Sequence, residues 1–222
     1  RKGLTNGLFE WLRKAPWGNP VFSGVFLAIV IFGFIGGITG VVMGVEQINL
    51  IIHNTIYVPG HFHATVAVGT TLTFMALTYF LIPVLFRRKM ILPGLAKIQP
   101  YLFAGGMTIF ILFMMGAGTL GVSRRHWDIS FPSTISGLSF EHPGTADMML
   151  TLVGIGAVLS VIGGGAYLLI TVGSILFGEK LDESAGVMQS FGVPLADSSY
   201  TATPPVLPMA AIEEHGSAGS FE

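Results

Sequence analysis

The chain has 222 residues with a formal net charge of −1, and only 10% of its residues are charged while 51% are hydrophobic. A soluble domain carries about 25% charged residues, and the mean hydropathy of this chain is +0.72. These values exclude a disordered chain, a coiled coil and a nucleic-acid-binding protein, which needs a basic surface. The absence of cysteine excludes disulfides, thiolate metal sites and thiol catalysis. The composition therefore indicates a protein that spans a membrane.

Four charge-poor runs are long enough to cross the hydrocarbon core, which needs about 20 apolar residues. They predict an all-α integral membrane protein with four transmembrane helices that form part of a larger helix bundle. Glycines recur every four residues at Gly36, Gly40 and Gly44, a spacing typical of helices that approach closely. Residues 47–55 are expected to form a loop or a short interfacial segment, and the acidic, proline-rich residues 181–222 an extended cytoplasmic tail. The expected spans lie near residues 20–44, 57–86, 100–122 and 148–177.

The basic residues predict the orientation of these helices. With four crossings, both termini and the 87–99 loop share one side of the membrane, and nine of the eleven Lys and Arg residues lie there. Only Arg124 and Arg125 lie on the other side. Cytoplasmic loops carry the excess of Lys and Arg, so we expect both termini to be cytoplasmic, in the inner (plasma) membrane of a cell.

The segment that begins at His53 and ends with His61-Phe-His63 places three of the six histidines within eleven positions, at the outward end of a membrane helix. Ionisable residues at membrane depth are rare and usually functional, although each imidazole could also simply bond a neighbouring helix. At about 100° per residue, two positions i and i+2 lie about 200° apart around the helix. The two rings therefore cannot chelate one ion, but each could bind a separate cofactor on its own side, and imidazole is a common axial ligand of haem iron.

Arg124 and Arg125 form the second unusual feature because they lie alone on the outer side, at the depth of the histidines. They could anchor the chain among lipid headgroups. Arginine also binds carboxylates through two hydrogen bonds, and haem propionates are carboxylates. An adjacent pair favours such an anionic partner. Asp128 could orient the pair or could be a solvated charge in the loop.

The order of these motifs resembles the latter part of subunit I of the heme-copper oxygen reductases, the cytochrome c oxidase family. Four stretches appear in the order that the family has: Gly36-Gly-Ile-Thr-Gly40, the His53-Asn-Thr triplet, Val58-Pro-Gly-His-Phe-His63 and the Gly121-Val-Ser-Arg-Arg125 loop. The Val-Pro-Gly before His-Phe-His is more similar to the B-type branch. The similarity covers about residues 11–180, so residues 1–180 are expected to form a four-helix C-terminal portion of the bundle.

The resemblance implies a role for each matching residue. His61 would ligate the high-spin haem where oxygen is reduced, and His63 the low-spin haem that supplies it with electrons, with Phe62 between the two haems. His53 would lie beside the propionates of the high-spin haem near the proton-exit region, and Arg124 and Arg125 would bind propionates. Two positions depart from the family: Asn49 and Asn54 replace aspartates and so lack the carboxylate oxygens that a magnesium ion prefers.

The resemblance also implies cofactors and partners that this chain cannot supply alone. The family's copper B ligands and its second low-spin haem ligand come from earlier helices, and His126, His142 and His215 lie at the wrong depth or spacing to replace them. We therefore expect two haems and a copper held together with the N-terminal helices of subunit I, on another chain or in an earlier part of the same one. Other expected partners are a subunit II-like electron-entry subunit, cytochrome c or quinol as donor, oxygen and membrane lipid.

Three functions remain open from the sequence. The first is a proton-pumping terminal oxidase that reduces oxygen to water. The second is a nitric oxide reductase of the same superfamily, with iron in place of copper. The third is a membrane electron carrier with haems bound by two histidines and no gas chemistry. Copper content separates the first two, and binding of carbon monoxide separates both from the third.

Overall fold

The computed structural model describes residues 9–124 and 144–181. These residues form α-helices and two π-helical segments, labelled η, and the described part of the chain contains no strand longer than an isolated bridge. The elements in chain order are α1 (Glu10–Arg13), α2 (Pro20–Val30), η1 (Ile31–Gly36), α3 (Gly37–Gly44), α4 (Glu46–Ile52), α5 (Tyr57–Phe62), η2 (His63–Thr70), α6 (Thr71–Leu85), α7 (Pro93–Thr119) and α8 (Gly144–Phe177).

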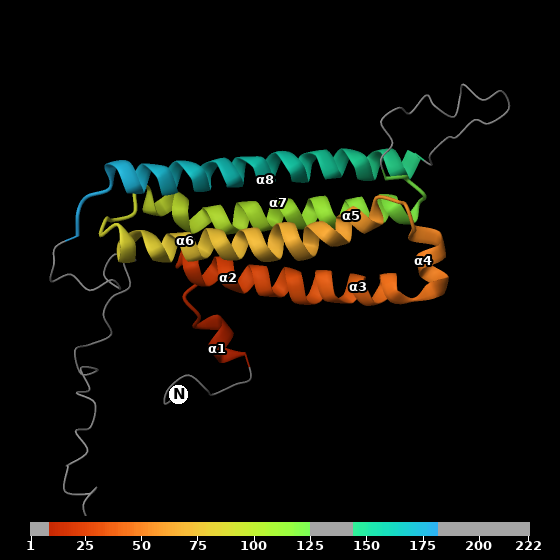
Figure 1. Cartoon of the computed structure of the whole chain (residues 1–222), viewed down its shortest axis with the longest axis horizontal. Helices are drawn as coiled ribbons and strands as arrows, with labels where there is room; N and C mark the ends of the chain where they lie inside the picture. The colour runs from red at the N-terminus through yellow and green to blue at the C-terminus, as the bar shows by residue number, and fades with distance from the viewer. Residues whose placement is uncertain (1–8, 125–143, 182–222) are drawn as a thin grey trace, which may run out of the picture.

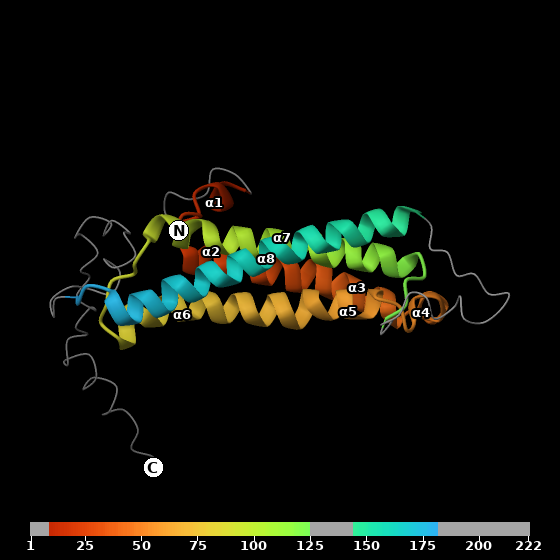
Figure 2. The ribbon, with the colours of Figure 1, turned by 90° about the horizontal axis from the view of Figure 1, so that it is seen from above.

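Successive elements join into long continuous helices, which we call rods. The rods lie side by side and run in alternating directions (Figures 1 and 2). Four of these rods are long and apolar enough to cross a membrane: Pro20–Gly44, Tyr57–Leu85, Pro93–Thr119 and Gly144–Phe177. The expected fold class is confirmed, and the protein is an all-α, multi-pass integral membrane protein. The tail at 182–222 lies outside the described residues, as do Arg125, His126, Asp128, His142 and His215.

Helix ends differ from the expected ones where local chemistry favours an earlier start. Helix α7 begins at Pro93 rather than near Pro100. Proline suits the first helical position, because its fixed φ is helical and the backbone N–H of that position has no partner within the helix. Helix α8 begins at Gly144 rather than Met148 and takes Asp147 into its first turn, where a negative charge is favoured by the helix dipole. Residues 47–52 of the 47–55 segment belong to the short helix α4, at one end of the bundle (Figure 1).

The membrane helices approach closely at particular glycines. A Cβ on Gly36 would lie 2.7 Å from Thr65 Cγ2, and one on Gly40 would lie 3.1 Å from His61 Cε1, whereas one on Gly44 would meet nothing within 4 Å. Among the described residues, two of the three regularly spaced glycines thus lie close to another helix. On the same rod Ile29, Phe34 and Val41 are more than half exposed, as expected for a surface that faces lipid or further helices.

A buried glutamine joins the last three membrane helices. Gln99 is completely buried and accepts a hydrogen bond from the Tyr79 hydroxyl on α6 at 3.1 Å. Its amide nitrogen donates to the Gly163 carbonyl of α8, also at 3.1 Å. These bonds satisfy polar groups that would be costly to bury unpaired, and they fix α7 against both neighbours.

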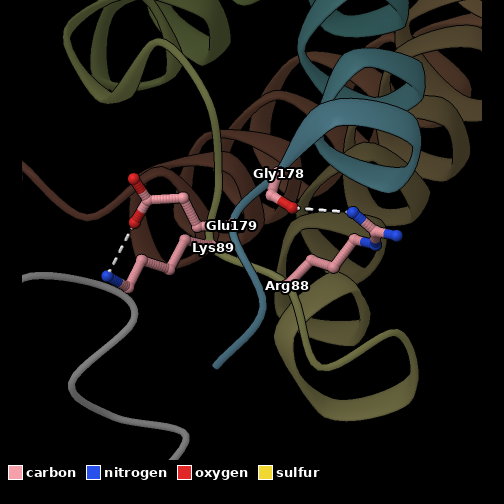
Figure 3. Close-up of polar contacts among 4 residues, drawn as sticks. All are labelled: Arg88, Lys89, Gly178 and Glu179. Carbon is pink, nitrogen blue, oxygen red and sulfur yellow. Dashed lines mark hydrogen bonds and ion pairs between the residues drawn. The ribbon is translucent and has the colours of Figure 1, made fainter. Parts of the chain in front are cut away.

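The end of the bundle where α6 and α8 finish is closed by a clasp, which we define as residues 87–91 paired with 174–181. Arg88 Nη1 donates to the Gly178 carbonyl at 2.7 Å, and Lys89 Nζ contacts Glu179 Oε2 at 2.9 Å (Figure 3). Backbone bonds from Lys89 N to Glu179 O and from Leu181 N to Arg87 O align the two segments. The hydrogen bond and positive charge of Lys89 hold the pKa of Glu179 below its ordinary value. Because both side chains are exposed, the pair adds little stability and the backbone bonds do most of the joining.

Candidate functional site

The histidine-bearing helix begins immediately after a tight turn at the end of the bundle that carries α4 (Figure 1). Thr55 is buried, and its hydroxyl donates to the Ile52 carbonyl at 2.7 Å while accepting from the Tyr57 backbone N–H at 3.2 Å. This bridge connects α4 to the first turn of α5. Pro59 lies in that first turn, where a missing N–H costs nothing, so the helix continues unbroken through His61 and His63.

The His61 ring faces α3 and is oriented by Thr39. His61 Nδ1 lies 2.9 Å from Thr39 Oγ1, and the hydroxyl of Thr39 lies 2.5 Å from the Ile35 carbonyl oxygen and 3.1 Å from that of Gly36. Because a hydroxyl has one hydrogen, which these carbonyls engage, its oxygen accepts from the His61 side. We therefore assign the proton to Nδ1. The free lone pair of the ring is then on Nε2, and a metal could bind that nitrogen.

The His63 ring is oriented by its own helix and faces α7. His63 Nδ1 lies 2.6 Å from the Pro59 carbonyl oxygen, which can only accept, so this nitrogen also carries the proton. The ring packs against Phe110 of α7 with centroids 5.0 Å apart and planes at 57°. Nε2 of His63 is again the nitrogen with the free lone pair. In both imidazoles the Nδ1 contacts thus leave Nε2 as the nitrogen that could bind a metal.

The two rings contact different helices, α3 and α7, as their spacing of two residues predicts. Within residues 9–124 and 144–181, no three His, Cys, Asp or Glu side chains gather in a way that could hold a metal ion between them. The arrangement instead offers single nitrogen ligands on two sides of one helix. Single ligands of this kind would suit an iron that a macrocycle already holds, because the macrocycle supplies most of the ligands that the metal needs.

A cleft of about 410 Å³ lies beside the same helix and is lined by Val58, Pro59, Phe62 and Arg124. Phe62 is 58% exposed, so a large aromatic side chain forms part of an open apolar wall. Arg124 Nε is buried and has no hydrogen-bond partner among the described residues. A buried donor without a partner is costly, and this one borders an apolar cleft. Arg124 also lines the cleft, so its guanidinium could pair with a carboxylate of a flat, apolar ligand there.

The chain after α7 is paired with the chain before α5. Ile56 N donates to the Val122 carbonyl at 2.9 Å, and Arg124 N donates to the Asn54 carbonyl at 2.8 Å. Thr55 and Ser123 form an antiparallel bridge between these two bonds. Arg124 is therefore held in register with the start of the histidine-bearing helix. His53 is exposed at the end of α4, next to this pairing.

The structure brings together His61, His63, Phe62 and Arg124 around one short helix, with His53 at its approach, while Arg125 lies outside the described residues. Sequence reasoning missed Thr39 as the partner of the His61 ring and Asn54 as the partner of Arg124. Thr39 lies within the glycine-rich stretch, one position before Gly40. A hydroxyl among small residues, where another helix can approach closely, is the sequence feature that could have indicated this partner.

Comparison with known proteins identifies the family. The family model described as "Cytochrome C and Quinol oxidase polypeptide I" matches residues 3–159, well over half of the chain. Cytochrome c oxidase subunit 1 of Thermus thermophilus is 36% identical over 157 residues, which are 67% of this chain and 26% of that protein. A second Thermus thermophilus cytochrome c oxidase subunit 1 sequence is 44% identical over 73 residues, 32% of this chain and 66% of its own length.

A solved structure agrees in fold as well as sequence. A heme-copper terminal oxidase, determined as a dimer by cryo-electron microscopy, superposes with a TM-score of 0.70 and 34% identity, covering 82% of this chain and 32% of that chain. The present chain thus spans about a quarter to a third of the length of these two larger relatives. The chain belongs to the cytochrome c and quinol oxidase polypeptide I family, the subunit I of heme-copper oxidases.

Proposed function

We propose that this chain supplies the C-terminal helices of the catalytic subunit of a terminal respiratory oxidase, in which His61 would hold a high-spin haem and His63 would hold a low-spin haem. The observation that carries this proposal is the pair of imidazoles on two sides of one helix, with Nδ1 of His61 against the Thr39 hydroxyl and Nδ1 of His63 against the Pro59 carbonyl. When bound, the haems and a copper ion supply electron transfer and the reduction of oxygen to water, coupled to proton translocation.

The residues of this chain fit such groups. Thr39 and the Pro59 carbonyl hold the two rings in the tautomer that leaves Nε2 free. The cleft beside Phe62 has the apolar wall that a porphyrin needs, and the guanidinium of Arg124, whose Nε has no acceptor among the described residues, could bind a propionate. Arg125 is the proposed second propionate ligand, and the role of His53 beside the propionates and the proton-exit region stays a prediction.

The chain acts in a larger assembly in this proposal. The copper ligands and the second low-spin haem ligand come from helices that precede these four in the subunit. A subunit II-like protein delivers electrons from cytochrome c or quinol, and both termini face the cytoplasm from the inner membrane. The clasp carries Arg87, Arg88, Lys89 and Lys180, which supports this orientation. The B-type branch stays a prediction.

The test is the metal content and ligand binding of the purified complex that contains this chain. We expect one copper per haem that binds carbon monoxide, measured by elemental analysis and by difference spectra of the reduced enzyme. Iron without copper at that centre would instead indicate a nitric oxide reductase. Haems that all fail to bind carbon monoxide would indicate an electron carrier, because a six-coordinate iron has no open position.

Replacing Thr39 by valine removes the acceptor of the His61 Nδ1–H while keeping the side-chain volume. We expect about 10–100-fold weaker retention of the high-spin haem, the usual cost of losing such an outer partner, with a lower iron–histidine stretching frequency in resonance Raman spectra. Thr73→Val is the matched control, because the Thr73 hydroxyl bonds the Gly69 carbonyl of its own helix at 2.6 Å. Equal effects of the two variants would contradict the role of Thr39.

Replacing Arg124 by glutamine removes a positive charge beside the proposed propionates. A positive charge favours the reduced haem, so we expect a lower midpoint potential in a redox titration. The shift should be tens of millivolts, since ~59 mV corresponds to about 1.4 kcal/mol for one electron and single charges contribute energies of that order in proteins. Lys97→Gln, which removes a charge at the other end of the bundle, should leave the potential unchanged. Unchanged potentials in both variants would exclude the propionate role.

A further inference from the structure

The turn between α4 and α5 contains a residue whose backbone conformation is unusual. Asn54 has φ = 61°, in the left-handed region, and is one of three non-glycine residues with positive φ in the described part of the chain. Asparagine enters this region more readily than other residues with a side chain, whereas a β-branched residue there is a clear outlier. The turn thus depends on a residue type that tolerates this conformation.

The left-handed turn determines where the Asn54 carbonyl points. That oxygen accepts the backbone N–H of Arg124 at 2.8 Å. The bond is the last described contact of the short pairing between residues 54–56 and 122–124. Without it, the Ile56 N to Val122 O bond would be the one remaining backbone hydrogen bond between these two described segments.

The position of Arg124 matters because its side chain borders the cleft. Arg124 lines the cleft together with Val58, Pro59 and Phe62. Its Nε is buried and has no acceptor among the described residues. Val58 and Pro59 belong to the first turn of α5, which begins three residues after Asn54. One short turn therefore sets both the start of the histidine-bearing helix and the place of the arginine that faces the same cleft.

We propose that Asn54 is a positioning residue, whose left-handed backbone holds Arg124 at the cleft so that its guanidinium can bind a haem propionate. This inference rests on the proposed function, because it needs a propionate in the cleft. Asn54 acts through its backbone carbonyl and the conformation it adopts, and its side-chain amide is dispensable for this role.

The experiment compares Asn54→Val and Asn54→Gly in the assembled oxidase. Valine disfavours a positive φ, whereas glycine adopts it freely and lacks the amide. We expect Asn54→Val to lower the haem midpoint potential in the same direction as Arg124→Gln, by at least half as much, and to reduce the haem content per protein. Asn54→Gly should keep the wild-type potential. If Asn54→Val fails to assemble, Asn54→Ala gives a milder form of the same change.

The double variant Asn54→Val with Arg124→Gln separates this role from general destabilisation. If Asn54 acts through Arg124, the double variant should shift the potential no further than Arg124→Gln alone. Additive shifts would overturn the inference, as would equal shifts in Asn54→Gly and Asn54→Val, which would assign the effect to the amide. If Arg124→Gln changes the potential but Asn54→Val does not, only the positioning role fails. If Arg124→Gln changes nothing, the propionate role and this inference fail together.

Discussion

An oxidase that carries His61→Ala is expected to lose the carbon monoxide-binding signal of its high-spin haem and nearly all oxygen consumption, while its low-spin signal remains. The His61 ring is the only described imidazole that faces α3, so no neighbour described in this chain can replace it. His63→Ala should have the opposite spectral effect, because His63 faces α7 and its loss leaves His61 and Thr39 in place. Optical spectra of the reduced enzyme, with and without carbon monoxide, measure both signals.

Val66→Ala provides the control for truncation on the same rod. Val66 lies three residues after His63 and is 45% exposed, so its truncation should leave both haem signals intact. Persistence of both signals in the two histidine variants would exclude ligation by this helix. Loss of both signals in either variant would indicate a failure of assembly, and the haem content of the purified protein distinguishes that outcome from selective loss.

The membrane spans were predictable because they depend on local properties. Charge-free runs of sufficient length place four helices, and the spacing of His61 and His63 predicts that their rings point to different neighbours. The helix ends were less predictable, because a charged residue does not always end a membrane helix. Lys97 and Asp147 lie inside α7 and α8 near the membrane surface, where a long side chain can reach the polar headgroups or a charge can favour a helix end.

The contacts that orient the site were not predictable because they join residues far apart in the chain. Thr39 and His61 are separated by 22 positions, and their contact depends on how closely α3 approaches α5 at Gly40. The same holds for Asn54 and Arg124, which meet only because the loops at one end of the bundle pair. The π-helical segments η1 and η2 also lack a local sequence signal, yet η2 begins at His63. Such segments are frequent at functional sites, since an extra residue in a turn redirects the side chains that follow.

Gly118→Ala is expected to have the largest effect on stability of any methyl group added at a described glycine. A Cβ on Gly118 would overlap the Tyr57 backbone nitrogen and lie 2.7 Å from Tyr57 Cα. Overpacking typically costs about 1–3 kcal/mol, and here the obstacle is backbone, which cannot move aside as a flexible side chain can. We therefore expect a loss of about 3 kcal/mol or more, seen as a lower temperature of haem release on heating. Tyr57 begins α5, so any adjustment also displaces His61 and should broaden the haem spectrum.

Two other glycines of α7 provide a graded comparison. A Cβ on Gly116 would meet only the flexible Met149 side chain, at 3.0 Å from Sδ, and a Cβ on Gly105 would meet nothing within 4 Å. Gly116→Ala should therefore cost less than Gly118→Ala. Gly105→Ala should be neutral or stabilising by up to about 1 kcal/mol, because alanine is the better helix former. The order of release temperatures should be Gly105→Ala, Gly116→Ala, then Gly118→Ala from highest to lowest. If all three variants release haem at one temperature, the close approach of α7 to α5 does not hold the ligand helix in place.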